Sequence, residues 1–453
     1  MSNKICFLGM NDDNIGVEAL LGSKAGSAFY YDRTPPDVLK RRYGAELASR
    51  LISEDAVLAD VRQFDLYVRA PGFARTHRIV SAAYSAGIAV RTNIEFAIER
   101  ARGRIVAISG TNGKTTVAHA LSSILRAAGR SHAICGNTGK SMSSALASGE
   151  DPEFWIVELS YAYLEGMVDL HADYAALTNI YPDHADRHSF PEYCRVKMRV
   201  FGEDPARIAK VLNIDDREIA DAIWSRLGGH PVDVTISTSS QDATFYFDGD
   251  AIYQRGVDGA FPLIRGAEVH PYMRMNASNY MIAAALAYQM AIPRKAIVTG
   301  LMSLQGVKNR CEILGTVDGV IYVNDAKATN FASGTRTLSA FAEYRKLVIV
   351  GGRSKGADLS RLRDLLGPAD RIVLYGANRS LLRRALGDVI IHEAGLVEDA
   401  LLAARDLAIA RGFKAVLLCP FCAADPADHP STEILGDHFS QAFAHTSYAA
   451  MEP

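Results

Sequence analysis

The sequence contains no apolar run that approaches the roughly 18 residues needed for a membrane-spanning helix. It also lacks an excess of charge of either sign, since 49 lysines and arginines stand against 51 aspartates and glutamates, for a net charge of −2. No overall electrostatic field therefore favours nucleic acid or an anionic membrane surface as a partner. Both absences favour a protein that acts on small molecules.

Cysteine is scarce for the length of the chain. The six cysteines, at positions 6, 135, 194, 311, 419 and 422, are scattered and mostly lie in apolar strand-like runs. This distribution argues against a disulfide framework and for a reducing, cytoplasmic location. The first nine residues read as a short strand rather than a signal peptide.

The most informative stretch is the loop 110–116, which follows an apolar strand candidate and precedes a helical pattern from Val117 to Ala128. Its glycines let backbone N–H groups turn toward phosphate oxygens, and the helix N-terminus adds a positive dipole end. Lys114 can reach the outer phosphates and Thr115 can hold Mg²⁺. An ordinary glycine turn is the alternative. We predict a nucleoside-triphosphate site made of Gly110, Thr111, Asn112, Gly113, Lys114, Thr115 and Thr116.

The chain is too long for a single core, and its strand candidates alternate with helical patterns. This rhythm predicts an α/β protein with mainly parallel sheets. We expect three domains: a Rossmann-like domain over 1–100, a P-loop ATPase-type domain over 101–306 and a Rossmann-like domain over 307–453. The strand candidates are 5–9, 28–31, 66–68, 88–90, 104–108, 154–160, 175–180, 319–323, 347–350, 372–374 and 415–418.

Polar residues follow many of these strands, at the edge where open α/β sheets bind ligands. Glu158 stands at the end of one strand and could be a magnesium ligand or a simple buried acceptor. The segment 183–188 holds two histidines, two aspartates and an arginine, too much polar chemistry for a structural loop. Asn276 and Asn279 precede a helix expected over 280–290, and could cap it or contact a nucleotide.

The first expected domain has weaker signals. Its first loop, 9–16, is a poor dinucleotide fingerprint, because Asp12 and Asp13 bring negative charge toward any diphosphate. Asp32, Arg33 and Gly72 follow the second and third strands and could bind a ligand or simply form turns.

In order and spacing, the polar segments of the chain resemble the motifs of the Mur ligases. Folylpolyglutamate synthases share the phosphate loop but lack the domain in front, so the length favours the Mur group. The resemblance spans nearly the whole chain and rests on 110–116, 158–160, 183–188, Tyr193 with Lys197, Asn276 with Asn279, 309–310, 325–330 and 351–356.

The resemblance implies an ATP-dependent ligase that phosphorylates a carboxylate and lets an amine attack the acyl phosphate. Lys114 would stabilise the transferred phosphate, and Thr115 with Glu158 would hold one Mg²⁺. A second Mg²⁺ would be held by His184 and a carbamylated Lys197. From its spacing alone, Lys197 could equally be a solvated helix lysine.

The resemblance also assigns the ligand contacts. ATP would meet Asn276, Asn279 and Arg310, with Asp325 near the ribose, and domain closure would complete that site. Asn137 and Thr138 would receive a UDP-sugar substrate, for which Asp32, Arg33 and Gly72 are further candidates. Lys327, Thr329, Lys355 and Ala424 would lie near the incoming amino acid.

The reaction so implied joins D-glutamate to UDP-N-acetylmuramoyl-L-alanine in peptidoglycan precursor synthesis, by a cytoplasmic monomer. Two departures from the family pattern keep a second hypothesis open, a ligase with another acceptor and amino acid. They are the acidic first loop and a last loop with Ala424 for serine, no phenylalanine after it, and added Asp425, Asp428 and His429. Asn309 also replaces the histidine usual before Arg310.

Two further alternatives remain. A non-catalytic ATP-binding regulator would be expected to lose the residues of catalysis, yet Lys114, Glu158, His184, Lys197 and Asp325 are all in place. The pair Cys419 and Cys422 has dithiol spacing, but it follows a strand instead of opening a helix as in thioredoxin-like proteins.

Overall fold

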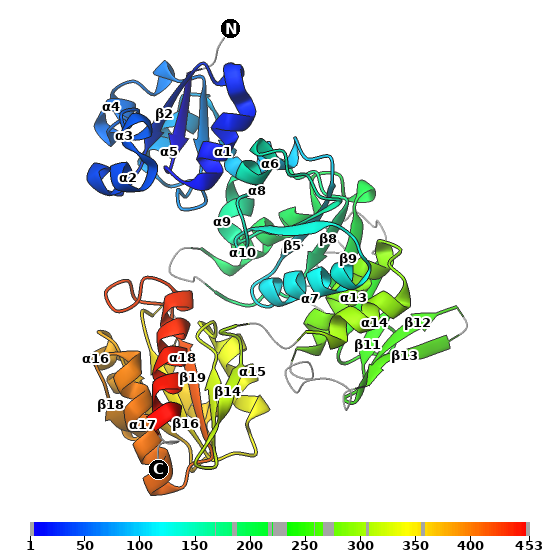
Figure 1. Ribbon diagram of the computed structural model, residues 1–453, viewed down its shortest axis with the longest axis vertical. Helices are drawn as coiled ribbons and strands as arrows, with labels where there is room; N and C mark the ends of the chain where they lie inside the picture. The colour runs from blue at the N-terminus through cyan, green and yellow to red at the C-terminus, as the bar shows by residue number, and fades with distance from the viewer. Residues whose placement is uncertain are drawn as a thin grey trace. The chain divides into compact units, whose positions relative to one another are not determined.

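The computed structural model describes residues 4–167, 169–183, 188–215, 220, 233–257, 259–265, 276–304, 308–354 and 358–449. The chain divides into two compact units, one of 1–180, 191–265 and 277–304, the other of 181–190, 266–276 and 305–453. Each unit is built of helices packed on mainly parallel sheets (Figure 1). The α/β fold class predicted from the sequence is confirmed.

The first unit begins with a four-stranded sheet of order β2-β1-β3-β4, in which all neighbours are parallel. The predicted strand positions agree with it to within a residue or two. One prediction was wrong, because the loop expected over 9–16 is helical from Asp12, where the Asn11 side chain caps the helix by accepting from the Asn14 amide. The elements are β1 (Lys4–Leu8), α1 (Asp12–Leu21), β2 (Ser27–Tyr31), α2 (Pro36–Tyr43), α3 (Ala45–Ala48), α4 (Glu54–Ala59), β3 (Leu66–Arg69), α5 (Arg78–Ser85), β4 (Ala89–Thr92) and α6 (Asn93–Ile98).

A nine-stranded sheet follows, of order β13-β12-β11-β10-β9-β8-β5-β7-β6. Its strands are parallel from β6 to β11, so the carboxyl ends of β5, β7 and β8 meet at one edge. The strands are β5 (Arg104–Ser109), β6 (His132–Gly136), β7 (Phe154–Glu158), β8 (Tyr174–Leu177), β9 (Ala209–Asn213), β10 (Val234–Ser237), β11 (Phe245–Phe247), β12 (Ala251–Gly256) and β13 (Gly259–Arg265).

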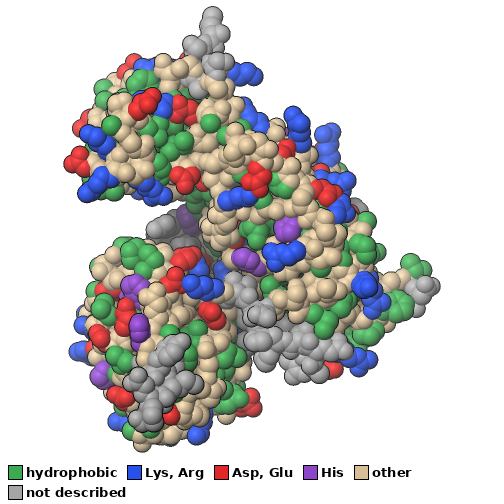
Figure 2. Space-filling view, viewed as in Figure 1, with side chains coloured by type: hydrophobic (Ala, Val, Ile, Leu, Met, Phe, Trp, Pro, Cys, Tyr) green, Lys and Arg blue, Asp and Glu red, His purple; other side chains and the backbone are tan. Residues whose placement is uncertain are grey.

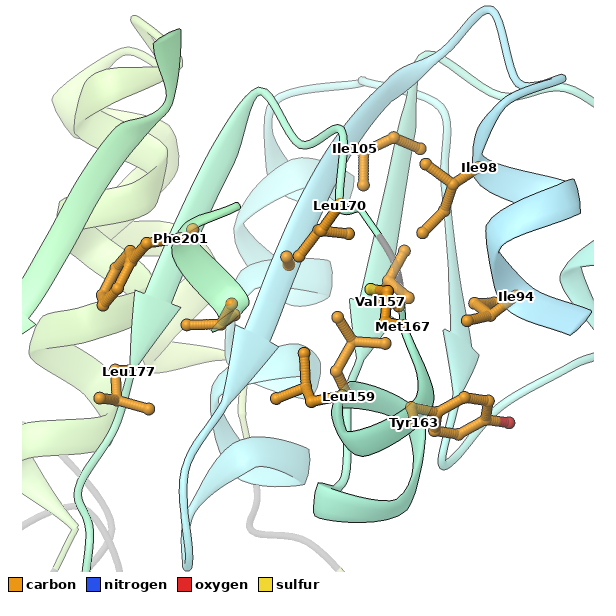
Figure 3. Packing of buried hydrophobic residues seen from close by; sticks show 14 of the residues in the cluster. Ile94, Ile98, Ile105, Val157, Leu159, Tyr163, Met167, Leu170, Leu177 and Phe201 are labelled. Atoms are coloured by element: carbon orange, nitrogen blue, oxygen red, sulfur yellow. The ribbon is translucent and has the colours of Figure 1, made fainter. Parts of the chain in front are cut away.

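Helices cover both faces of this sheet. On one face α7 (Lys114–Ala127) lies beside α13 (Ala277–Gln289) and α14 (Arg294–Met302) (Figure 1). On the other, apolar side chains fill the space between the sheet, α6 and the segment that contains α9 (Tyr161–Gly166). Figure 3 shows Ile98 of α6 beside Ile105 of β5, with Val157 and Met167 close by. This core fixes the strand ends that carry the polar residues. The remaining helices are α8 (Met142–Ala147) and α10 (Phe190–Lys197).

The second unit contains a six-stranded sheet of order β14-β15-β19-β16-β17-β18, parallel except for the β14–β15 pair. Its last strand in sequence, β19, runs to Phe421, three residues beyond the predicted end, because Phe421 still pairs with Gly351. The elements are β14 (Glu312–Val317), β15 (Val320–Asn324), α15 (Phe331–Ala340), β16 (Lys346–Gly351), β17 (Arg371–Tyr375), α16 (Arg379–Leu386), β18 (Ile390–Glu393), α17 (Val397–Arg411), β19 (Ala415–Phe421) and α18 (Thr432–Ala449).

Two properties expected from composition can be compared with the structure. Among the helices of the described residues, none is both long and apolar enough to cross a membrane, and acidic and basic side chains are interspersed over the visible face (Figure 2). All six cysteines are free. Burial raises the pKa of the Cys419 thiol well above its usual value, the opposite of what a reactive dithiol needs.

A buried arginine joins the first sheet to the nine-stranded sheet. The Arg69 side chain is fully buried; it donates to the Ala162 carbonyl at 3.0 Å and lies 3.5 Å from the Glu165 carboxylate. A Cβ on Gly166 would come within 1.9 Å of the guanidinium, so any other residue there would force the arginine to shift. The ion pair of Arg69 with Glu165 therefore connects β3 to α9 through a charge that is buried away from water.

Replacing Arg69 with methionine should destabilise this unit by about 3–5 kcal/mol, because the Glu165 carboxylate would stay buried without its partner. Urea unfolding of the full chain measures the loss. Arg78, whose side chain is 72% exposed, provides the matched control, and R78M should change stability by no more than about 0.5 kcal/mol. Equal stabilities of R69M and R78M would show that the buried pair contributes nothing.

Candidate active site

The loop after β5 has the backbone conformation of a phosphate cradle. Gly110 and Gly113 adopt φ of +139° and +87°, which side-chain-bearing residues rarely take. Space excludes a side chain as well, because a Cβ on Gly110 would meet Thr178 Oγ1 at 1.9 Å and one on Gly113 would meet Asn279 Oδ1 at 2.2 Å. Gly113 precedes α7, whose N-terminus therefore opens onto the loop.

Two residues that the sequence analysis missed brace this loop. Asn179 accepts from the Thr111 amide at 2.9 Å through its carbonyl, and from the Asn112 amide at 3.0 Å through its side chain. Thr178 donates to the Asn112 carbonyl at 2.6 Å. The sequence signal that could have identified them is that two polar residues directly follow β8, the strand that pairs with β5.

Lys114 and Thr115 begin α7 and point to different partners. The Lys114 ammonium donates to the carbonyls of Gly110 and Thr111 at 2.8 and 2.9 Å. The Thr115 hydroxyl donates to Glu158 Oε2 at 2.9 Å. The lysine charge therefore lies at the loop, and the threonine oxygen lies beside a carboxylate.

Glu158 gathers three of the predicted residues. It is 1% exposed at the end of β7 and accepts from Thr115, from Thr138 at 2.8 Å and from Asn137 at 3.4 Å. A carboxylate with two hydroxyl oxygens around it is a set of hard ligands that suits Mg²⁺. The residues present therefore fit a magnesium ion beside the phosphate loop.

Lys197 is not a surface lysine, so the solvated-helix alternative is wrong. It ends α10, is 2% exposed, and donates to the Gly110 carbonyl at 2.9 Å. Tyr193, one turn earlier, lies under the ammonium and places its hydroxyl 3.2 Å from the Thr111 hydroxyl. Tyr193 also stacks on Tyr161. The helix thus directs a buried amine at the phosphate loop.

The other nucleotide candidates fall in different places. Asn279 lies inside α13, which starts three residues before the predicted helix, so it is no cap, and its amide packs against Gly113. In the second unit, Asn276 Oδ1 lies 3.5 Å from an Arg336 nitrogen. Asp325 accepts from Thr337. Burial raises the pKa of Asp325, while the charges of Arg310 and Arg336 act to lower it. His184 and Lys355 lie outside the described residues.

A cavity of about 770 Å³ in the second unit contains one of the predicted amino-acid contacts, Thr329. Arg336, Arg361 and Phe421 also line it, and so do three aspartates, so the cavity offers charges of both signs beside an aromatic wall. Phe421 adopts φ +58° and fits because residue 334, which faces its ring, is glycine. Sequence reasoning missed Phe421 as a lining residue, because its unusual backbone angle turns it out of the strand pattern.

The acidic residues of the last loop have partners within the protein. Asp425 accepts from Asn378, and Asp428 accepts from the Ala377 amide at 2.9 Å. These two carboxylates therefore fasten the loop, which also holds Ala424, to the end of β17. Both carboxylates are therefore engaged by donors of the protein itself.

Lys327 is engaged as well. Its ammonium forms an ion pair with Glu433, at the start of α18. Burial alone would raise the pKa of Glu433, but the hydrogen bond and charge of Lys327 outweigh it and lower the pKa to about 2. Glu433 is therefore anionic at neutral pH and competes for the lysine with any carboxylate ligand.

In the first sheet, the candidate residues lie around one loop. Asp32 accepts from the Met10 amide at 2.7 Å and the Thr34 amide at 2.8 Å, while the Arg33 guanidinium stacks over Phe73, next to Gly72. Asp12 and Asp13 occupy the first turn of α1. Their negative charges oppose the attraction that the positive end of the helix dipole would otherwise exert on a phosphate.

Comparison with known proteins agrees with this geometry. Residues 108–287 match the Mur ligase middle domain. A UDP-N-acetylmuramoylalanine–D-glutamate ligase of Streptomyces avermitilis is 34% identical over 383 residues, which cover 79% of this chain and 80% of the relative. A ligase of the same name from Caldicellulosiruptor saccharolyticus is 28% identical over 429 residues, covering 93% and 94%.

Solved structures share the fold. A pseudomurein peptide ligase type C from Methanothermus fervidus superposes with a TM-score of 0.60 at 15% identity, over 98% of this chain and all of the other. A UDP-N-acetylmuramate-alanine ligase from Thermotoga maritima gives 0.58 at 14% identity, with the same coverage. The chain belongs to the Mur ligase family, the ATP-dependent ligases of peptidoglycan precursor synthesis.

Proposed function

We propose that this protein joins D-glutamate to the carboxyl group of UDP-N-acetylmuramoyl-L-alanine in the cytoplasm, with ATP converted to ADP and phosphate. The observation that carries the proposal is the cluster of Lys114, Thr115, Glu158 and Lys197 around one glycine loop, in a chain 34% identical to a ligase of that name. The protein acts as a monomer on small molecules, without nucleic acid.

The chemistry proceeds in two balanced steps. An oxygen of the acceptor carboxylate attacks the γ-phosphorus and ADP leaves. The amine then attacks the acyl carbon, phosphate leaves with one former carboxylate oxygen, and the proton lost by the amine passes to solvent. Lys114 and the loop amides neutralise charge on the transferred phosphoryl group. Thr115 and Glu158 hold one Mg²⁺, and His184 with a carbamylated Lys197 holds a second. The ions supply charge neutralisation and alignment.

The binding roles follow the family pattern over three domains, 1–100, 101–306 and 307–453. Asp32, Arg33, Gly72, Asn137 and Thr138 bind the acceptor. Asn276, Asn279, Arg310 and Asp325 contact ATP, and Lys327, Thr329, Lys355 and Ala424 contact the amino acid. The cavity beside Thr329 supports the last group, because its lining carries arginines, which can pair with a carboxylate, and aspartates, which can pair with an ammonium group.

A change of Glu433 to glutamine should lower KM for the amino acid about two- to fivefold, with kcat little changed. Removing the competing carboxylate releases Lys327, and a partly exposed ion pair is worth about 0.2–1 kcal/mol. Initial rates against amino-acid concentration measure the shift. The matched control is E343Q, at an exposed glutamate of the same unit, which should leave KM unaltered. A raised KM in E433Q would mean that Glu433 positions the lysine instead.

A second candidate is a Mur-like ligase of another pathway, favoured by Asp12 and Asp13 in the first turn of α1. Two carboxylates there oppose a diphosphate at that helix end. Phosphate release with ATP, Mg²⁺, UDP-N-acetylmuramoyl-L-alanine and a panel of amino acids, with mass spectrometry of the product, separates the two. A glutamate adduct supports the first candidate. No phosphate release with any amino acid on that acceptor, while ATP still binds, supports the second candidate.

A further inference from the structure

Away from the phosphate loop, three potential metal ligands from separate segments converge in the second unit. Glu398 is in the first turn of α17, His429 is in the loop 422–431 between β19 and α18, and His438 is on α18. One ligand atom from each side chain lies within 4.8 Å of the other two. His429 also belongs to the last loop, where this sequence departs from the family pattern.

The His429 imidazole is buried beside Glu398. Its side chain is 2% exposed, and its Nε2 lies 3.9 Å from Glu398 Oε2. The rings of His438 and Tyr375 pack edge-on against it. A buried polar group without a partner costs free energy, so such a group calls for a ligand or an ordered water.

Two polar atoms close to His429, one on Glu398 and one on His438, lack a hydrogen-bond partner among the described residues. They are the buried atoms Glu398 Oε2 and His438 Nδ1. His438 Nδ1 lies 2.9 Å from Glu398 Oε1 without the alignment of a hydrogen bond.

We propose that Glu398, His429 and His438 bind a Zn²⁺ ion that fastens the loop 422–431 to α17 and α18. Ligands about 2.1 Å from a tetrahedral zinc lie roughly 3.4 Å apart. The observed separations are 2.9 Å from His438 Nδ1 to Glu398 Oε1 and 3.9 Å from His429 Nε2 to Glu398 Oε2, on either side of that value although they involve the two different carboxylate oxygens. Two imidazoles and a carboxylate suit zinc better than Mg²⁺, which prefers oxygen ligands, and they leave the fourth position for water.

The proposed zinc site does not depend on which substrates the enzyme uses. A bound ion would affect the loop 422–431, which also contains Ala424 and the two aspartates bound to residues 377 and 378. A metal at this point would fix the loop from one side while Asp425 and Asp428 fix it from the other.

The test uses the full chain, stripped of metal and kept in excess Mg²⁺ so that oxygen-rich sites are already filled. We expect about one Zn²⁺ per chain to remain after desalting, and Co²⁺ to give the visible absorption of a nitrogen-ligated tetrahedral site. H438Q and E398Q should weaken Zn²⁺ binding at least about tenfold. H445Q, at an exposed histidine on the same helix, is the matched control and should bind like the parent protein.

Thermal unfolding gives an independent readout. Zn²⁺ should raise the Tm of the parent protein and of H445Q, but not that of H438Q, whose Tm without metal should match the parent because His438 is 42% exposed. Retention of no zinc by the parent protein, or equal retention by H438Q and H445Q, would overturn the proposal.

Discussion

Alanine in place of Lys114 is expected to lower kcat by about 10³-fold, because removing one preorganised donor at a site of developing charge costs about 10²–10³ and here a full positive charge is lost as well. The Lys114 ammonium is already held at the loop by the carbonyls of Gly110 and Thr111. In the reaction it would exchange these for phosphate oxygens. ADP formation by the purified variant, with all substrates present, measures the loss.

The control for Lys114 is Lys295, an exposed lysine on α14 of the same unit. K295A should keep the parental rate. Circular dichroism and Tm of K114A should match the parent protein, because Lys114 lies at a helix start and is only partly buried. Parental turnover by K114A would refute the phosphate-cradle role and, with it, the proposed ligase mechanism.

Loss of the Lys197 amine should be comparably severe, with kcat falling about 10²-fold or more, because the proposed carbamate supplies a metal ligand worth several kcal/mol. The buried position of Lys197 beside the Gly110 carbonyl is the basis for this expectation. Two variants separate charge from carbamylation. K197M removes the amine, whereas K197R keeps a positive charge but offers no amine of suitable reactivity to CO₂. Both should be inactive.

Carbon dioxide provides a second test of the same residue. The parental rate should fall in buffer freed of CO₂ and recover when bicarbonate is added, with carbamate detected at Lys197 by carbon-13 NMR. K197R would then differ from the parent protein only in activity, not in fold. A K197R protein with full activity, or a parental rate indifferent to CO₂ together with an absent carbamate signal, would contradict the carbamylated-lysine proposal.

Much of the fold follows from local patterns. Apolar runs that alternate with helical segments predict the parallel sheets, and glycine, lysine and threonine after a strand predict the phosphate loop. Element boundaries were less accurate because capping and pairing decide them. Asn11 starts α1 at Asp12, and the pairing of Phe421 with Gly351 prolongs β19.

The site shows where sequence reasoning ends. Spacing alone left Lys197 undecided, since only the packing of α10 shows that its amine is buried at the loop. The brace from Thr178 and Asn179 and the pair of Lys327 with Glu433 depend on contacts between distant segments. The cluster of Glu398, His429 and His438 has no sequence motif, because its residues come from three segments whose approach is set by tertiary packing.

The most direct test of the central claim, that ATP activates a carboxylate for attack by an amine, follows oxygen atoms. UDP-N-acetylmuramoyl-L-alanine labelled with oxygen-18 in its carboxylate is incubated with the protein, ATP, Mg²⁺ and D-glutamate, and the released phosphate is analysed by mass spectrometry. An acyl phosphate requires one labelled oxygen in each phosphate formed during ligation. Unlabelled phosphate accompanying the ligated product would contradict the account.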